Sequence, residues 1–575
     1  MMADQTAGTA GEGDVAASKS GQTSNSVQKP KAQKAAQKKT DAPKQGAGKK
    51  KMEGAALIGI DVAKEDDFSE WYQQVILKGG MIEFSDVPGC YIFLEETMNI
   101  WENIRTFFTT RIAAMGVKSC YFPMFITEDA LNREKEHLEG FAAEVAWVDR
   151  GGKTKLQKPL AIRPTSETAM YDYYSKRIRS HRDLPLKLNQ WNNVVRWEFK
   201  HPQPFLRSRE FLWQEGHTAH LRKAQAEEEV MQILDHYAAI YEDLLAVPMV
   251  KGRKTKNEQF AGADYTTTVE GFIPATGRGI QGGTSHCLGQ NFAKMFNIVV
   301  EDPDAERKEG QQSEKVHVWQ NSWGFTTRSI GVMIMIHSDN KGLVLPPRIS
   351  ETQVIIVPVG ITAKTTPEAE KQLYKEIDAL VEVLKDAQVW GERVRVQVDD
   401  GKESPGYKFN KWELKGCPLR LEFGPKDSEK HQVTYSRRDK PGEKGTIQIS
   451  ELEAQIPEIL QTIQKELLAK ASEEYASHRK TITSWSDFVP ALNAKNVCII
   501  PHCLEGDCED QIKELSKGNV EGQEVDEKAP SMGAKSLCIP FEQDVYKGLT
   551  VGETKCLNPQ CEKKAEKWVM FGRSY

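Results

Sequence analysis

Apolar residues recur with a helical period in three stretches of the first half of the chain. The first covers residues 68–82, and the second covers 100–112 and precedes a strand that runs to Pro123. The third covers residues 224–246, where we expect Glu227–Glu229 in the first turn, because the helix dipole favours anions there. The apolar positions of the first two helices are Phe68, Trp71, Tyr72, Val75 and Ile76, and Ile100, Ile104, Phe107, Phe108 and Ile112.

After residue 350 the pattern changes to short strands that alternate with helices. A continuous apolar strand at 352–359 is followed by a helix at 366–387, and the alternation continues for about 100 residues, which indicates a separate α/β domain. A further helix at 451–476 leads to a cysteine-bearing module. The other elements of the α/β domain are strands at 393–400, 419–423 and 432–438 and a helix-like spacing at 407–414.

Two strands near residue 200 combine charged and aromatic side chains on one face. The sequence "VVRWEF" (194–199) and the sequence "RSREFLWQEGHT" (207–218) both alternate with the period of a strand, so we expect an antiparallel hairpin. An ion pair on a solvated face is the ordinary alternative. Aromatic side chains between the charges favour instead a polar ligand pocket with a flat aromatic compartment. The shared face holds Arg196, Glu198, Phe211, Trp213, Glu215 and His217.

The formal net charge of −5 conceals a basic first segment. Residues 1–51 hold ten lysines and four acids, a net +6, so the remainder carries −11. This tail lacks aromatic residues, and we expect it to be disordered, either as a solubilising extension or as a weak, non-specific RNA-binding segment. The chain's start has early acids and no apolar core, and no stretch approaches a membrane span. We therefore expect a cytoplasmic protein without a membrane partner.

Six of the ten cysteines follow residue 490. Two pairs, "CLEGDC" and "CLNPQC", lie about fifty residues apart, and in a reducing compartment such pairs favour a closed tetrahedral Zn²⁺ site over disulfides. Cys498 and Cys538 are alternatives, although their apolar neighbours favour buried thiols. The predicted zinc ligands are Cys503, Cys508, Cys556 and Cys561.

The hairpin resembles motif 2 of the class II aminoacyl-tRNA synthetases, which has an Arg-x-Glu strand, a loop arginine and a returning aromatic strand. The helix and strand that end at Pro123 resemble motif 1, and "NSWGFTTRSIGVMI" (321–334) resembles motif 3. Within this class, "RPTSET" (163–168), "GRGIQGGTSHCLGQNFAKMF" (277–296), "SMGAKSLCIPF" (531–541) and the terminal "FGRSY" resemble the prolyl-tRNA synthetases of the eukaryotic and archaeal type.

This resemblance implies a two-step reaction in which L-proline and ATP form prolyl-adenylate and the prolyl group passes to the 3′ end of tRNA(Pro). Arginine suits the first step because its planar fork neutralises and orients phosphate and carboxylate oxygens. The resemblance assigns catalysis to Arg196 and Arg328, with Arg196 also on the proline carboxylate. It implies Mg²⁺ with the ATP, held mainly by phosphates and weakly by Gln281. The ATP-binding residues that it implies are Arg196, Glu198, Arg207, Phe211, Gln281, Thr284, Thr326 and Arg328.

Proline presents an apolar ring and a secondary ammonium, and the same resemblance assigns residues to each. Aromatic walls and a histidine enclose the ring, while hydroxyl and carboxylate oxygens accept hydrogen bonds from the nitrogen. Glu167 also has an ordinary interpretation as an acid at a helix N-terminus. The implied proline-binding residues are Thr165, Glu167, Arg196, Trp213, Glu215, His217, Phe260 and His286.

The implied architecture is α/β with four parts. We expect a tail (1–51), an α+β catalytic domain on an antiparallel sheet (52–350), an α/β anticodon-binding domain (351–450) and a small C-terminal α/β domain with a helix and zinc (451–575). The resemblance also implies a homodimer through motif 1 around Pro123. It leaves open membership of a larger synthetase complex and whether the terminal Tyr575 folds toward the active site. In the anticodon-binding domain, Arg437, Arg438 and Lys440 are either RNA phosphate contacts or solvated charges.

Two alternatives remain at this point. Another class II synthetase, for threonine, serine, glycine or histidine, would share the three motifs, although aromatic residues in the pocket and the lack of nearby zinc ligands argue against threonine. A catalytically inactive homologue that binds RNA would not need to retain all three arginines of the predicted ATP site. Testing the twenty amino acids in pyrophosphate exchange separates these possibilities.

Overall fold

The computed structural model describes residues 59–137, 145–197, 202–305, 314–517 and 532–575. The lysine-rich tail predicted for residues 1–51 and the predicted ATP ligand Glu198 lie outside these ranges, so both remain predictions. In the described part of the chain no helix is long and apolar enough to cross a bilayer.

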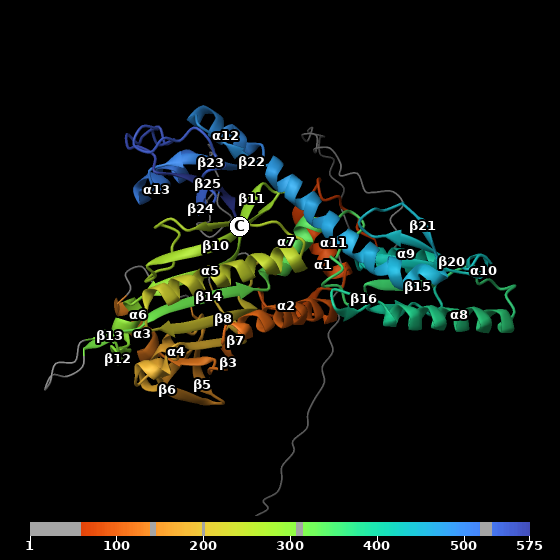
Figure 1. The fold of residues 1–575 in the computed structure, drawn as a ribbon, viewed down its shortest axis with the longest axis horizontal. Helices are drawn as coiled ribbons and strands as arrows, with labels where there is room; N and C mark the ends of the chain where they lie inside the picture. The colour runs from red at the N-terminus through yellow and green to blue at the C-terminus, as the bar shows by residue number, and fades with distance from the viewer. Residues whose placement is uncertain (1–58, 138–144, 198–201, 306–313, 518–531) are drawn as a thin grey trace, which may run out of the picture. The chain divides into compact units, whose positions relative to one another are not determined.

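An eleven-stranded sheet combines strands from residues 118–326 with strands from residues 479–574, in the order β22-β23-β25-β24-β9-β10-β11-β14-β8-β7-β3. Figure 1 shows its central strands side by side under α5. Neighbouring strands from β24 to β7 are antiparallel, as predicted, and β3 joins β7 in parallel. The strands of the first part are β3 (Lys118–Ser119), β7 (Leu186–Val195), β8 (Glu210–His220), β9 (Val250–Arg253), β10 (Tyr265–Ile273), β11 (Arg278–Gly289) and β14 (Trp319–Thr326).

Helices pack on this sheet around the main hydrophobic core. The helical period predicted α1 (Phe68–Lys78) and α2 (Glu95–Ala114), and Ile100, Ile104, Phe108 and Ile112 are buried as expected. The third predicted helix is α5 (Lys223–Ala239) continued by one π-helical turn, η2 (Ile240–Leu244). The remaining helix of this core is α7 (Arg328–His337).

The expected position of Glu227–Glu229 in the first turn of α5 is wrong, because the helix begins at Lys223 and its first turn holds no acid. Glu229 is buried instead of lying at the helix end. Its carboxylate lies 3.0 Å from His220 Nε2 and 3.1 Å from the Lys187 ammonium. The Glu229 carboxylate therefore joins α5 to Lys187 of β7 and His220 of β8.

Smaller elements surround the main sheet. Figure 1 shows α3, α4, β5 and β6 together at one side of it. The hairpin of β1 (Ile82–Phe84) and β2 (Tyr91–Phe93) is antiparallel. The other peripheral elements are β4 (Phe125–Thr127), α3 (Glu128–His137), β5 (Trp147–Gly151), β6 (Thr154–Ile162), α4 (Glu167–Arg177), α6 (Asn291–Met295), β12 (Val299–Glu301) and β13 (Lys315–His317).

The predicted α/β region has its own five-stranded sheet in the order β18-β15-β19-β20-β21 and its own core. The sequence pattern placed the strands at 352–359, 419–423 and 432–438 and the helices at 366–387 and 407–414 well. The strand expected at 393–400 divides into β17 (Glu392–Arg393) and β18 (Val396–Val398), and three short elements at 388–389, 425–429 and 445–448 were not predicted. The other elements are β15 (Val354–Pro358), α8 (Pro367–Asp386), β16 (Gln388–Val389), α9 (Pro405–Leu414), β19 (Leu419–Phe423), α10 (Pro425–Glu429), β20 (Gln432–Arg437) and β21 (Gly445–Gln448).

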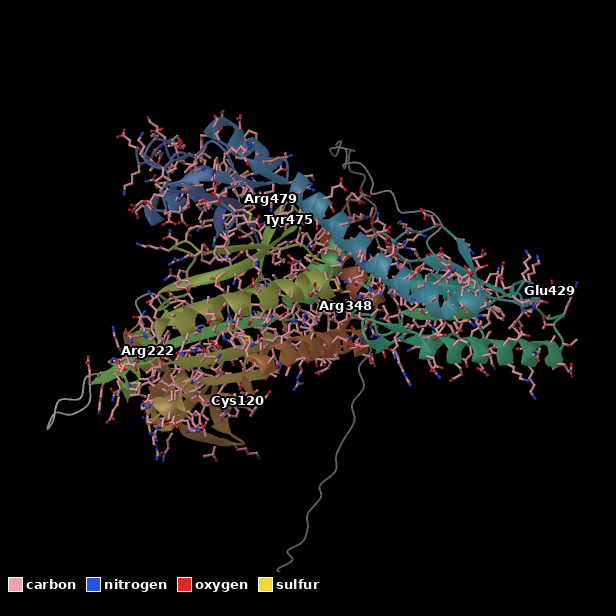
Figure 2. The ribbon with its side chains drawn as sticks, in the orientation of Figure 1. Cys120, Arg222, Arg348, Glu429, Tyr475 and Arg479 are labelled. Atoms are coloured by element: carbon pink, nitrogen blue, oxygen red, sulfur yellow. The ribbon has the colours of Figure 1, made fainter. Side chains whose placement is uncertain are left out.

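Helix α11 (Leu452–Ser477) leads from this region to the C-terminal strands (Figure 1). Tyr475 and Arg479, labelled in Figure 2, lie at its far end, where the Tyr475 ring stacks on Phe272 of β10. The C-terminal sheet joins the main sheet because β24 pairs with β9. Its elements are β22 (Arg479–Thr481), α12 (Trp485–Asn493), β23 (Val497–His502), α13 (Gly506–Leu515), β24 (Lys535–Pro540) and β25 (Lys567–Ser574).

Candidate active site

A cavity of about 340 Å³ lies over the central strands β8, β11 and β14. Side chains from segments more than 150 residues apart line it, which is the convergence that the family resemblance implied. Thirteen of the predicted ligand-binding residues line the cavity: Thr165, Glu167, Arg196, Phe211, Trp213, Glu215, His217, Phe260, Gln281, Thr284, His286, Thr326 and Arg328.

Arginine and aromatic side chains form one end of this cavity. The Arg196 guanidinium lies 5.7 Å from the Phe211 ring centre and 5.3 Å from that of Trp213, and its Nε donates to Pro164 O at 3.0 Å. Phe211 and Trp213 meet edge to face at 6.3 Å. Such a wall can bind two groups next to each other, an anion at the guanidinium and a planar ring against the aromatic faces.

Arg328 begins α7 directly after β14. Its backbone N donates to Thr326 Oγ1 at 3.1 Å, and its guanidinium donates to Gln281 O at 3.4 Å and to Leu206 O at 3.2 Å. These contacts hold the arginine between β11, β14 and the loop before β8. Its planar cation is therefore fixed at the cavity wall, where it can stack on a planar ring.

A second wall consists of Phe260 and His286. Their ring centres lie 4.7 Å apart, and the Thr266 hydroxyl contacts His286 Nδ1 at 2.9 Å. The same hydroxyl accepts a hydrogen bond from Phe260 N at 3.1 Å. Burial lowers the pKa of His286 to about 3, so this wall presents a neutral imidazole and an apolar ring.

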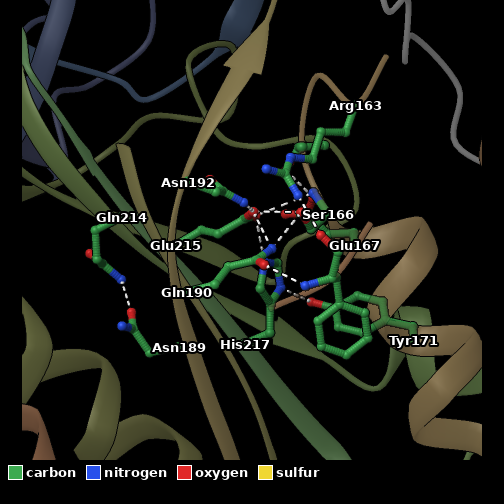
Figure 3. Close-up of polar contacts among 12 residues, drawn as sticks. Arg163, Ser166, Glu167, Tyr171, Asn189, Gln190, Asn192, Gln214, Glu215 and His217 are labelled. Carbon is green, nitrogen blue, oxygen red and sulfur yellow. Dashed lines mark hydrogen bonds and ion pairs between the residues drawn. The ribbon is translucent and has the colours of Figure 1, made fainter. Parts of the chain in front are cut away.

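The floor of the cavity contains the buried carboxylate of Glu215, and Figure 3 shows the side chains that converge on it. Gln190 donates to its Oε1 at 2.8 Å, Asn192 donates to the same oxygen at 2.9 Å, and the Ser166 hydroxyl donates to it as well. Ser166 N donates to Oε2 at 3.2 Å, and His217 Nε2 lies 3.0 Å from that oxygen. Burial opposes ionisation of Glu215, but these hydrogen bonds outweigh it and lower the pKa below its ordinary value.

Two further contacts complete this floor. The Tyr171 hydroxyl lies 3.0 Å from His217 Nδ1, so a neutral His217 with its proton on Nε2 accepts from Tyr171 and donates to Glu215. Thr165 donates a hydrogen bond to the Glu167 carboxylate. Ligand atoms of Glu167, Glu215 and His217 all lie within 4.8 Å of one another. The floor therefore presents concentrated negative charge to a bound cation.

The strand of motif 2 ends earlier than predicted. β7 stops at Val195, so Arg196 follows the strand and does not lie inside it, although Arg196 N still donates to Arg209 O at 2.8 Å. Arg207 is not among the lining residues, whereas its neighbours Leu206 and Ser208 are. Its backbone pairs with Gln203 across the loop between the strands.

Sequence reasoning missed several residues of the site. Glu215 is the register partner of Gln190, and Asn192 is that of Trp213. The amide-rich "NQWNN" of this strand was the available signal, since strand interiors seldom hold so many amides. Further lining residues that the sequence did not indicate include Phe205, Leu206, Ser208, Lys254, Glu258, Thr266 and Ser322.

The chain's last residue packs beside this region. The Tyr575 hydroxyl donates to Thr276 Oγ1 at 3.1 Å, and its backbone N donates to Gly279 O at 3.2 Å. Its ring contacts the main core, so the terminus is held by β11 and is not a frayed end.

The C-terminal cysteines gather in two close pairs. Sγ of Cys503 lies 3.7 Å from that of Cys561, and Sγ of Cys508 lies 3.6 Å from that of Cys556. A tetrahedral zinc ion with bonds of about 2.3 Å separates its sulfur ligands by about 3.8 Å, so each pair has the spacing of two ligands of one ion. His502, which sequence reasoning did not select, joins Cys503, Cys508 and Cys556 in a group whose ligand atoms lie within 4.8 Å of one another, and the predicted ligand Cys561 is not in that group. Cys498 and Cys538, the alternatives, are buried in strands outside that group.

Two of the three basic residues considered for RNA contact are committed to ion pairs with little exposure. Arg438 is buried and makes a bidentate pair with Asp339 at 2.6 and 2.8 Å. Arg437 pairs with Asp439 at 2.6 Å and also with Glu466. Lys440 lies 2.8 Å from Glu466 and is more exposed. Arg438 is therefore neither an RNA phosphate contact nor a solvated charge. Its guanidinium binds Asp339 and links the α/β region to the segment after α7.

Three family models match this chain. One described as tRNA synthetase class II core domain (G, H, P, S and T) matches residues 147–337, and one described as anticodon binding domain matches residues 353–459. A third, described as prolyl-tRNA synthetase, C-terminal, matches residues 485–575. Together they cover most of the chain after residue 146.

Curated relatives and solved structures agree with these models. A cytoplasmic proline–tRNA ligase from Arabidopsis thaliana is 48% identical over 93% of this chain and 94% of its own length. A bifunctional glutamate/proline–tRNA ligase from Drosophila melanogaster is 52% identical over 95% of this chain, which spans 31% of that relative. A crystal structure of prolyl-tRNA synthetase from Cryptosporidium parvum complexed with L-proline and AMP is 45% identical, with a TM-score of 0.80, and covers 90% of this chain and 98% of that one.

Proposed function

The chain belongs to the prolyl-tRNA synthetases, class II aminoacyl-tRNA synthetases that join proline to tRNA, and from this premise we propose how its own residues carry out that reaction. In this proposal residues 52–350 form the catalytic domain, 351–450 the anticodon-binding domain and 451–575 the C-terminal domain. The cavity over β8, β11 and β14 is the site where L-proline and ATP form prolyl-adenylate.

Arg196 and Arg328 are the proposed catalytic residues. Arg196 contacts both the proline carboxylate and the α-phosphate, so the two anions approach each other across one cation. Arg328 and Phe211 enclose the adenine from opposite faces, and Arg328 stays fixed by its contacts with Gln281 and Leu206. Holding both reactants and neutralising the charge that develops on phosphorus supply most of the rate enhancement. The other proposed ATP ligands are Glu198, Arg207, Thr284 and Thr326.

The opposite end of the cavity binds proline. Trp213, Phe260 and His286 enclose the ring, and Thr165 and Glu167 accept hydrogen bonds from the secondary ammonium. Glu215, supported by His217, adds a buried negative charge beneath that ammonium. This arrangement favours a small cationic amine with an apolar ring, because the neutral His286 wall repels no cation and the floor attracts one.

Two metal ions fit this chain. Magnesium keeps its waters and binds mainly to substrate phosphates. Gln281 and Thr284 at the cavity wall would orient the ion, and the ion would neutralise part of the phosphate charge. Zinc held by Cys503, Cys508, Cys556 and Cys561 would be structural, and the sulfur separations of 3.6 and 3.7 Å support this set. His502 is the alternative fourth ligand.

The macromolecular partners follow from the family and from exposed residues. tRNA(Pro) is the acceptor of the prolyl group. A homodimer through the segment around Pro123 is supported by exposed aromatic side chains there, Tyr121 at 70% and Phe125 at 51% exposure. The name of the Arabidopsis relative supports a cytoplasmic location, and the fused Drosophila relative supports membership of a larger synthetase complex.

The convergence of Arg196, Arg328, Trp213 and His286 on one cavity carries this proposal. ATP–pyrophosphate exchange with each of the twenty amino acids tests it, and proline alone should support rapid exchange. Glu167→Gln should raise the KM for proline at least tenfold with little change in the KM for ATP, since it weakens one charge-assisted hydrogen bond. Exchange with another amino acid in preference to proline would contradict the assignment.

A further inference from the structure

A loop that leads into the proline wall is held by the C-terminal domain. Residues 254–260 connect β9 to the wall residue Phe260, and Lys254 and Glu258 of this loop line the cavity. The strand beside β9 at this edge of the sheet is β24 of the C-terminal domain, so the loop that follows β9 lies next to that domain.

Three buried residues meet across the domain boundary. The Thr255 and Ser536 hydroxyl oxygens each lie 2.8 Å from Glu509 Oε2 and 2.7 Å from each other. The two hydroxyl protons supply two hydrogen bonds among these three oxygens, so the three side chains form one hydrogen-bonded group.

Three further residues secure the same loop. The buried Lys254 ammonium lies 2.6 Å from Glu270 Oε1 and donates to Leu537 O at 2.8 Å, so it joins β10 to β24. Asn257 Nδ2 donates to Gly506 O at 2.9 Å, and Glu258 lies 3.4 Å from Lys535. Every position from 254 to 258 except 256 therefore contacts the C-terminal domain through its side chain.

The loop passes this restraint on to the proline wall. Phe260 N donates to Thr266 Oγ1 of β10, and the same hydroxyl contacts His286 Nδ1, so the position of the loop sets the Phe260 side of this wall. The ATP end draws instead on β8, β14 and the start of α7. A shift of the loop would thus widen the proline compartment and leave the nucleotide compartment in place.

We propose that the C-terminal domain is a positioning element for proline recognition, acting through Thr255, Ser536 and Glu509 on the loop that carries Phe260. This inference rests on the proposed function of the cavity. It assigns the domain a role in the affinity and selectivity for the amino acid, exerted by residues that themselves touch neither substrate.

The test compares variants on both sides of the boundary with a control inside the C-terminal domain. Thr255→Val and Ser536→Ala should each raise the Kd for proline about tenfold, as expected when a hydrogen bond to a carboxylate is lost, with the KM for ATP and kcat nearly unchanged. Thr255→Ser retains the hydroxyl and should restore the affinity. The double variant should resemble the single ones, because all three side chains form one group.

Ser516→Ala is the matched control. Ser516 is buried at the end of α13 and accepts a hydrogen bond from Ala534 N at 2.7 Å, but the structure gives it no contact with residues 254–260. This variant should lower Tm and leave the Kd for proline unchanged. Equal rises in Kd for Ser516→Ala and Thr255→Val would overturn the inference, as would an unchanged Kd in Thr255→Val. A failure of the proposed function is distinguishable, because the wild-type enzyme would then show no proline-dependent exchange.

Discussion

Glu215 shows how a carboxylate can stay ionised in a buried site where most of its hydrogen-bond donors are neutral. A buried charge normally requires a counter-ion or a full set of hydrogen bonds. Among the described residues its only ion-pair partner is His217, and neutral donors from Ser166, Gln190 and Asn192 supply the other contacts. These dipoles stabilise the negative charge without cancelling it, so the charge remains available to a bound ammonium.

Removing one of these dipoles should change both affinity and its pH dependence. We expect Asn192→Ala to lower kcat/KM for proline about tenfold to a hundredfold, because a hydrogen bond to a charged group contributes about 1.5–3 kcal/mol. The loss of a donor to the ionised form also raises the pKa of Glu215, so the acidic limb of the kcat/KM profile should move to higher pH. Steady-state pyrophosphate exchange between pH 5 and 8 measures both effects.

Asn193→Ala provides the neighbouring control for this prediction. Asn193 donates to Glu210 at 2.7 Å on the opposite face of β7, away from the carboxylate of Glu215. This variant should stay within about twofold of wild type. An Asn192→Ala profile with an unmoved acidic limb would contradict the role assigned to the neutral donors.

Individual site residues were predictable where one strand carried them. Alternation along β8 placed Phe211, Trp213, Glu215 and His217 on one face, and the cavity confirms that they lie together. Their partners Gln190 and Asn192 come from β7, and only the register between the strands brings them to Glu215. Sequence alone did not give that register, because residues 196–209 separate the two strands and no short turn fixes their pairing.

At the level of elements, long helices were easier to predict than strand ends. The 26 residues of α11 and the 20 of α8 each repeat the helical period several times, so their limits came within two residues. The alternating pattern of β7 continues beyond Val195, yet the strand ends there because its partner β8 begins at Glu210. Strand limits depend on the partner strand, and the periodicity of one segment does not contain that information.

The position of Arg438 gives a prediction about the contact between two elements. Its guanidinium joins β20 and Glu413 O of α9 to Asp339, which follows α7, so Arg438→Met should lower the free energy of unfolding by about 2 kcal/mol. Because the side chain is buried in this contact, the salt dependence of tRNA binding should not change. Thermal unfolding measures the first effect, and the slope of log Kd against log salt concentration measures the second.

Lys385→Met is the control for this contact, since Lys385 forms an exposed pair with Glu382 in the same α/β region. We expect its Tm to match that of wild type. A smaller salt slope in Arg438→Met would mean that the guanidinium binds phosphate, and it would refute the interpretation of this residue as a structural contact.

At the scale of the whole molecule, one sheet connects regions that are distant in sequence. β9 and β24 pair although nearly 300 residues separate them, and β25 runs parallel to β11 at Arg278 and Gly279. The core of the α/β region was predictable from local patterns, whereas the C-terminal module was indicated only by its cysteines. The attachment of both was not predictable, because it depends on long-range contacts such as Lys254 with Leu537 O and Arg438 with Asp339.

The junction between the catalytic and α/β regions contains an acid whose ionisation should couple stability to pH. Glu96, in the first turn of α2, accepts a hydrogen bond from Glu351 N at 3.3 Å. Burial raises the pKa of Glu96 to about 7, and the nearby Glu351 carboxylate acts in the same direction, while Lys415 and Arg395 oppose it. The folded state therefore binds a proton that the unfolded state releases near pH 4.5.

A raised carboxyl pKa stabilises the fold at low pH, and this contribution is lost as the pH rises from about 4.5 to about 7. Glu96→Gln keeps the shape of the side chain and removes its charge, so its Tm should exceed that of wild type by a margin that grows between pH 5.5 and pH 8. With allowance for partial exposure, the difference at pH 8 should approach about 2 kcal/mol. Glu95→Gln, at the exposed position beside it, removes the same charge from the helix terminus and should give a Tm difference from wild type that is constant over this range. If both variants behave alike, the effect belongs to the helix dipole and not to the buried junction.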